Sequence, residues 1–154
     1  MGEIAYRFNG TVDKHIGDSI MVVFGSPECA PHADDAVRAV QTAVEMQKKA
    51  LEIDSELKKK NGLRLRTGIG ISTGEVFSGI LDSLRKKEFT SIGMAVNIAA
   101  RLQNMARAGE ILMNESTFQK LSGQKGLGDI VVRALPSVTV KGIDEPITVY
   151  RING

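Results

Sequence analysis

The fold class is decided by residues 11–24, Thr11-Val12-Asp13-Lys14-His15-Ile16-Gly17-Asp18-Ser19-Ile20-Met21-Val22-Val23-Phe24. Two β-rich runs, Thr11 to Ile16 and Ser19 to Phe24, flank the dipeptide Gly17-Asp18. Two turn-forming residues between such runs are a strong signal for a β-hairpin. The sequence therefore predicts two antiparallel strands joined directly, with Asp18 at the tip of the hairpin.

The remainder of the chain alternates strands and helices without a linker. Apolar residues recur at helical spacing from about residue 32 to residue 60, and Gly93 opens another helix that continues to about Ala106. Further strands are expected at 63–72, 75–81, 88–92, 110–113, 130–133 and 138–152, with a short helix at 115–121. The strands at 63–72 and 75–81 form a second pair around Thr73-Gly74. We expect an α+β fold, a mostly antiparallel sheet with helices packed chiefly on one face.

Length and composition narrow the class of protein. With 154 residues and 42% hydrophobic content, the chain can bury one core, so we expect a single domain over residues 1–154. The net charge of +2 and the mixed signs along the chain do not indicate a nucleic-acid partner, so any anion site must be local. Cys29 is the only cysteine, which excludes an internal disulfide and a Cys-rich zinc cluster. No apolar run reaches the roughly 20 residues that span a bilayer, and no signal pattern is present, so we expect a cytoplasmic location.

Several polar residues are candidates for a functional site, and each has a structural alternative. Asp18 is either a turn-forming aspartate or a carboxylate left free at the hairpin tip to bind a metal. Asn97 and Arg101 are spaced i, i+4 on the helix opened by Gly93, so both project from one helix face. Polar residues at this spacing are often exposed side chains without a function, but the apolar residues beside this pair place it at the border of a packed surface. The glycines between residues 68 and 79 form no P-loop and no dinucleotide fingerprint, and we expect them to permit close backbone approach and a tight turn.

Four segments, taken in order and with their spacing, form a specific pattern: Gly10 to Met21, Gly68 to Gly74, Val96 to Leu102, and Val140-Lys141-Gly142. On these segments, residues 9–150 resemble the catalytic domain of the class III adenylyl and guanylyl cyclases of bacterial type. The resemblance implies a ferredoxin-like α/β domain. It also implies a head-to-tail homodimer in which each active site lies across the dimer interface.

The resemblance assigns Asp18 to one of the family's metal-binding aspartates, which hold Mg²⁺ or Mn²⁺. It assigns Lys14 to the residue that reads the purine and Thr90 to its partner. An ammonium can donate a hydrogen bond to adenine N1, whereas guanine N1 carries a hydrogen, so a lysine with a threonine favours ATP over GTP.

The same resemblance assigns the remaining roles to the second half of the chain. Asn97 matches the residue that positions the ribose, and Arg101 matches the residue that stabilises the triphosphate as charge develops. Arginine suits this role because its fork of donors is planar and permanently charged. Lys141 matches a second phosphate-binding cation. The implied reaction is attack of the ribose 3′ oxygen on the α-phosphorus, which yields cyclic AMP and pyrophosphate.

One feature of the family pattern is absent from the given residues. The family usually carries its first metal aspartate on a strand ahead of the hairpin, whereas this sequence starts almost at the hairpin. We therefore expect impaired turnover, because the two-metal site lacks one carboxylate. Three hypotheses stay open at this point: an ATP-using cyclase domain, a catalytically inactive nucleotide-binding module, and a dimerisation domain without a ligand.

Overall fold

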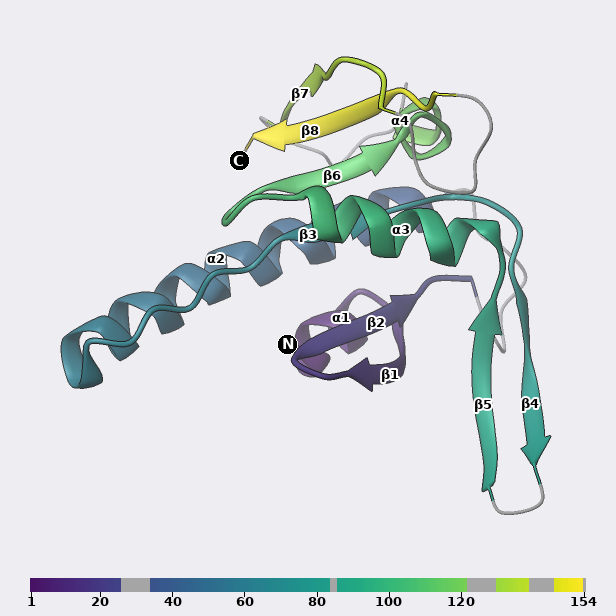
Figure 1. Cartoon of the computed structure of the whole chain (residues 1–154), viewed down its shortest axis with the longest axis horizontal. Helices are drawn as coiled ribbons and strands as arrows, with labels where there is room; N and C mark the ends of the chain where they lie inside the picture. Colours follow the sequence, from purple (N-terminus) through teal and green to yellow (C-terminus); the bar gives the residue numbers. More distant parts are fainter. Residues whose placement is uncertain (26–33, 84–85, 122–129, 139–145, 154) are drawn as a thin grey trace.

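The computed structural model describes residues 1–25, 34–83, 86–121, 130–138 and 146–153. Its elements in chain order are α1 (Gly2–Arg7), β1 (Thr11–Ile16), β2 (Ser19–Val23), α2 (Asp35–Asn61), β3 (Ile69–Ile71), β4 (Phe77–Ser83), β5 (Lys86–Ile92), α3 (Met94–Met105), β6 (Ile111–Asn114), α4 (Glu115–Leu121), β7 (Val131–Ala134) and β8 (Val149–Asn153). They form a four-stranded sheet, two separate hairpins and the helices around them (Figure 1). None of the helices in these ranges is both long and apolar enough to cross a membrane.

The four-stranded sheet has the order β3-β6-β8-β7 and is mixed. β3 runs parallel to β6, whereas the pairs β6–β8 and β7–β8 are antiparallel. The hairpins β1–β2 and β4–β5 are also antiparallel. The predicted α+β class with mostly antiparallel pairing is therefore confirmed.

Helices cover both faces of this sheet. Ile111 and Met113 of β6 pack against Val40 and neighbouring residues of α2 on one face, where α4 also contributes to the core. The intervening Leu112 packs against Leu102 of α3, because successive strand residues point to opposite faces. The expectation that helices lie chiefly on one face is wrong, since α3 covers the face opposite to α2.

Glycine at position 70 allows α3 to lie directly on β3. A Cβ atom at Gly70 would lie 2.2 Å from the carbonyl oxygen of Ala99 and 2.4 Å from the amide nitrogen of Gln103. Both are backbone atoms of α3, so no side-chain movement could relieve the clash. This confirms the predicted role of a glycine from this group in close backbone approach.

The predicted pairing of strands around Thr73-Gly74 is wrong. β3 pairs with β6, and β4 pairs with β5 from Phe77↔Ile92 to Ser83↔Lys86. The side chain of Asn114 explains the difference, because its Oδ1 accepts from the backbone N–H of Thr73 at 3.2 Å and its Nδ2 donates to the Thr73 carbonyl at 3.3 Å. With its backbone bonded in this way, the segment after β3 leaves the sheet and leads into the β4–β5 hairpin, which projects from the body (Figure 1).

The N-terminal helix α1, which the sequence pattern did not predict, supports the first hairpin. Its buried Ile4 and Ala5 pack with Met46 of α2, and Val12 and Val22 of the hairpin pack against the same cluster. The β1–β2 hairpin is therefore attached to α2 by a small apolar core of its own. This attachment fixes the position of the residues that β1 presents to β5.

Candidate functional site

The tip of the first hairpin forms as the sequence predicted. Ile16 pairs with Ser19, which leaves Gly17 and Asp18 as a two-residue turn, and Gly17 has the left-handed φ of 61° that such turns favour. Asp18 is exposed at this tip. Among the described residues, no hydrogen bond or ion pair engages its carboxylate, so both oxygens are available to a ligand.

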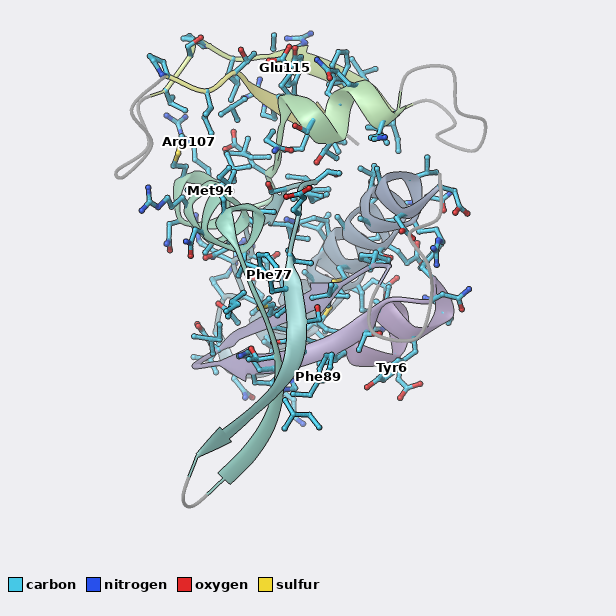
Figure 2. The ribbon with its side chains drawn as sticks, turned by 90° about the vertical axis from the view of Figure 1, so that its right-hand side faces the viewer. Tyr6, Phe77, Phe89, Met94, Arg107 and Glu115 are labelled. Atoms are coloured by element: carbon cyan, nitrogen blue, oxygen red, sulfur yellow. The ribbon has the colours of Figure 1, made fainter. Side chains whose placement is uncertain are left out.

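Lys14 and Thr90 meet although 76 positions separate them in the sequence. The Nζ atom of Lys14 donates a hydrogen bond to Oγ1 of Thr90. This contact arises because β5 passes beside the β1–β2 hairpin, as the position of Phe89 in Figure 2 illustrates. Thr90 is buried and the side chain of Lys14 is 28% exposed, so the ammonium lies at the border between the interior and solvent.

Asp13 joins this pair, and the sequence analysis did not single it out. Its side chain is only 1% exposed, and Oδ1 accepts a hydrogen bond of 2.9 Å from the backbone N–H of Ser91. Its Oδ2 lies 3.3 Å from Nζ of Lys14 and 3.4 Å from Oγ1 of Thr90. The signal in the sequence is the pair of consecutive charges at 13 and 14, which breaks the alternation expected of a strand. We refer to Asp13, Lys14, Thr90 and Ser91 as the buried cluster.

The other two predicted residues lie on α3, which begins shortly after the buried cluster. Gly93 caps this helix with a φ of 154°, and a Cβ there would lie 2.8 Å from the carbonyl oxygen of Glu75. Asn97 is exposed and Arg101 is partly buried, one helical turn apart on the same face. In the described ranges neither side chain takes part in a hydrogen bond or an ion pair. We refer to Asp18, Asn97 and Arg101 as the open residues.

Lys141, the second predicted phosphate-binding cation, lies outside the described residues. The structure therefore brings Lys14 and Thr90 together, places Asn97 and Arg101 on one helix, and leaves Lys141 as a prediction from the sequence.

Among the described residues, Asp18 is the side chain at this site that best suits a metal ion. No group of three or more His, Cys, Asp or Glu side chains that could hold a metal occurs among the described residues. Asp18 nevertheless fits a hard divalent cation, since it offers unengaged carboxylate oxygens at an exposed turn. With Asp18 as the protein ligand, phosphate oxygens of a bound nucleotide and water would supply the remaining ligands of the metal.

The comparisons with known proteins agree on one family. Residues 6–154 match the model described as the adenylate and guanylate cyclase catalytic domain. An adenylate cyclase from Anabaena cylindrica is 32% identical over an alignment of 160 residues, gaps included, which covers 99% of this chain and 30% of that protein. The terminal-differentiation-specific adenylate cyclase of Dictyostelium discoideum is 31% identical over 151 residues, which cover 93% of this chain and 6% of that protein.

A solved structure supports the same relationship. The crystal structure of the adenylyl cyclase CyaB from P. aeruginosa superimposes with a TM-score of 0.88 at 30% sequence identity, over 99% of this chain and 76% of that chain. By contrast, the chain spans less than a third of the length of the cyclases from Anabaena cylindrica and Dictyostelium discoideum. The chain belongs to the class III adenylyl and guanylyl cyclase catalytic domain family, and its α+β fold is that of a nucleotidyl cyclase.

Proposed function

We propose that this cyclase domain converts ATP to cyclic AMP and pyrophosphate. The observation that carries the choice of ATP is the contact between Lys14 and Thr90, which puts an ammonium and a hydroxyl side by side where β1 meets β5. The family model covers adenylate and guanylate cyclases alike, so the choice of purine has to come from these side chains.

The hydrogen-bonding capacity of Lys14 suits adenine. An ammonium has three donors, of which one is directed to Thr90 and a second lies near Asp13. The third donor remains for the base, and adenine N1 is an acceptor. Guanine presents N1–H at the same position. Because N1–H and the ammonium are both donors, no hydrogen bond can form between them.

The residues on α3 suit the ribose and the triphosphate. Asn97 has an amide that can both donate to and accept from a ribose hydroxyl, and Arg101 carries a permanent positive charge one turn further along. Lys141 is proposed as a second cation for the phosphates. Because Asn97 and Arg101 lie on a helix packed by Leu102, the backbone that carries them is in place before the substrate binds.

The reaction itself needs no nucleophilic side chain. The ribose 3′ oxygen attacks the α-phosphorus, the bond from that phosphorus to the oxygen bridging the α- and β-phosphates breaks, and pyrophosphate leaves while the 3′ proton passes to solvent or a phosphate oxygen. Asn97 holds the ribose in the attacking geometry, and Arg101 stabilises the negative charge that builds on the phosphates. Mg²⁺ or Mn²⁺, with Asp18 as one ligand, supplies further positive charge against the phosphate oxygens when bound.

We also propose that the chain works as a head-to-tail homodimer. The projecting β4–β5 hairpin and the start of α3 expose large apolar side chains, with Phe77 77%, Ile80 67%, Ile92 53% and Met94 56% exposed. Phe77 and Met94 are labelled in Figure 2. Apolar side chains gathered in this way favour burial against a partner, and a second copy would also bring another set of open residues to the site.

Product analysis tests the proposal. The protein is incubated with Mn²⁺ and either ATP or GTP, and the products are separated and identified by mass spectrometry. We expect cyclic AMP and pyrophosphate in equal amounts at low turnover, less product from GTP, and none from the Asp18→Ala variant. Recovery of bound but unchanged ATP would identify a nucleotide-binding module instead, and failure to bind any nucleotide would leave only the dimerisation function.

A further inference from the structure

Strand β1 is irregular at Asp13. Val12 pairs with Val22, but Lys14 pairs with Met21, so Asp13 is an extra residue in the ladder and forms a β-bulge. In a regular strand, consecutive side chains point to opposite faces. The bulge changes this alternation, and the side chains of Asp13 and Lys14 both reach Thr90 on β5.

The charges on either side of Thr90 fix the direction of its hydroxyl hydrogen. An ammonium can only donate, and an ionised carboxylate can only accept. Since Lys14 donates to Oγ1, and Oδ2 of Asp13 lies 3.4 Å away on the acceptor side, the Thr90 hydrogen has to point at Asp13. Asp13 cannot swing away easily, because its other oxygen is held at 2.9 Å by the backbone N–H of Ser91 and its side chain is only 1% exposed.

We infer that Asp13 is a specificity-determining residue that makes Thr90 an obligate acceptor toward the base. This role of Asp13 rests on the proposed function, in which Lys14 and Thr90 read the purine. A hydroxyl by itself is ambivalent, because it can accept from the 6-amino group of adenine or donate to the 6-carbonyl of guanine. With its hydrogen committed to Asp13, Thr90 keeps one lone pair for an amino group and has no hydrogen for a carbonyl. Asp13 therefore selects adenine without touching it.

The substitution Asp13→Asn reverses this polarity with little change in shape. The asparagine Oδ1 can still accept from the N–H of Ser91, which places its Nδ2 where Oδ2 was. An amide nitrogen donates to Thr90 instead of accepting from it, so the hydroxyl hydrogen can then be donated to the 6-carbonyl of guanine. We expect the preference for adenine over guanine to fall by about tenfold, the usual size of one hydrogen bond gained or lost.

The experiment is a double-mutant cycle on the ratio of dissociation constants for adenine and guanine nucleotides. Calorimetry with 3′-deoxy-ATP and 3′-deoxy-GTP, which lack the attacking oxygen, measures binding without turnover. Asp13→Asn should reduce the preference for the adenine nucleotide in the wild-type background and reduce it less in a Thr90→Val background, where only its contact with Lys14 remains. Thr90→Ser should retain the preference, because it keeps the hydroxyl. An unchanged ratio in Asp13→Asn, or an equal reduction in both backgrounds, would overturn the inference.

A control and a second measurement keep the test independent of folding defects. Glu110→Gln neutralises another paired carboxylate, bonded to the backbone of Arg107 and to Arg151, and should leave the ratio unchanged. If Asp13→Asn does not fold, the wild-type protein is titrated with the 5′-triphosphate of 6-methoxypurine riboside, which keeps N1 as an acceptor for Lys14 but presents an acceptor oxygen at position 6. It should bind at least about tenfold more weakly than ATP, because Thr90 has no hydrogen to donate to that oxygen. Binding as tight as that of ATP would overturn the role of Asp13. Failure of the wild-type protein to bind either nucleotide would instead count against the proposed function.

Discussion

The buried cluster and the open residues differ in how completely the chain itself assembles them. Asp13, Lys14 and Thr90 already contact one another across two strands, with the Asp13 side chain almost fully buried. Asp18 and Arg101 have no hydrogen-bonding or ionic partner among the described residues. Under the proposed function, this difference means that the groups that select the base are assembled within one chain, whereas the groups that act on the phosphates need substrate, a metal ion and a second chain to complete the site. Substitutions in the two groups should therefore have different signatures.

The largest effect should come from an open residue. Arg101→Ala should lower kcat by about 10²-fold or more, because a cation that stabilises developing charge is lost. The melting temperature should stay close to that of the wild type, since the substitution breaks no hydrogen bond or ion pair among the described residues. Arg107→Ala, which removes an exposed arginine just beyond the same helix, is the matched control and should leave kcat unchanged. An equal loss in both variants would point to the general charge of this face and not to Arg101.

The second prediction tests whether the open residues come from two chains. If Asp18 of one copy acts on the same nucleotide as Arg101 of the other, neither Asp18→Ala nor Arg101→Ala is active alone. A mixture of the two should recover roughly a quarter of the wild-type activity, because half of the dimers are mixed and one of their two sites is intact. The activity of the mixture is measured after heterodimers have been verified by mass spectrometry. Inactive mixtures despite heterodimers would contradict the shared site.

The third prediction concerns stability and sets the buried cluster against the open residues. Lys14→Ala removes the cation beside Asp13 and leaves a buried carboxylate with fewer partners, which should lower the free energy of unfolding by about 1–3 kcal/mol. Arg101→Ala should change it by no more than about 0.5 kcal/mol. Denaturant unfolding of both variants measures the difference. Equal losses would show that the buried cluster is no more tightly integrated into the fold than the open residues.

The smallest effect is expected for a paired carboxylate outside both groups. The backbone N–H of Arg107 lowers the pKa of Glu110, and Arg151 lowers it further, while burial opposes both. A lowered pKa contributes stability that is present above the unfolded value of roughly 4.3 and is lost as the pH falls through the folded value. The difference in melting temperature between the wild type and Glu110→Gln should thus be full at pH 7 and fade below about pH 4. A difference that does not depend on pH would show that the charge of Glu110 contributes nothing.

Local pattern in the sequence predicted the elements that carry the site. Gly17 and Asp18 marked the first hairpin, and the helical spacing that ends at about residue 60 agrees with the observed end of α2 at Asn61, where Gly62 forms a left-handed cap. Gly93 opens α3 as expected. These features depend on turn and cap chemistry within a few residues, which is why they could be read directly.

Pairings between distant segments were harder to predict. The parallel pairing of β3 with β6 depends on partners some forty residues apart, and the exit of the chain after β3 depends on Asn114, which lies just as far from Thr73. No local periodicity encodes either choice. The contact of Lys14 with Thr90 was expected only through the family pattern. Asp13 takes part in that contact because it lies in a β-bulge. The bulge depends on how β1 pairs with β2, which the sequence pattern does not specify.

We propose above that the buried cluster makes this domain an ATP-selective cyclase, and the relative affinity for the two purine nucleotides tests this most directly. Calorimetric titration of the unmodified protein with 3′-deoxy-ATP and 3′-deoxy-GTP, each with Mn²⁺, gives both dissociation constants under identical conditions. We predict that the adenine nucleotide binds at least about tenfold more tightly, because the ammonium of Lys14 and the acceptor-only hydroxyl of Thr90 both favour adenine. Equal affinities, or tighter binding of the guanine nucleotide, would contradict the claim.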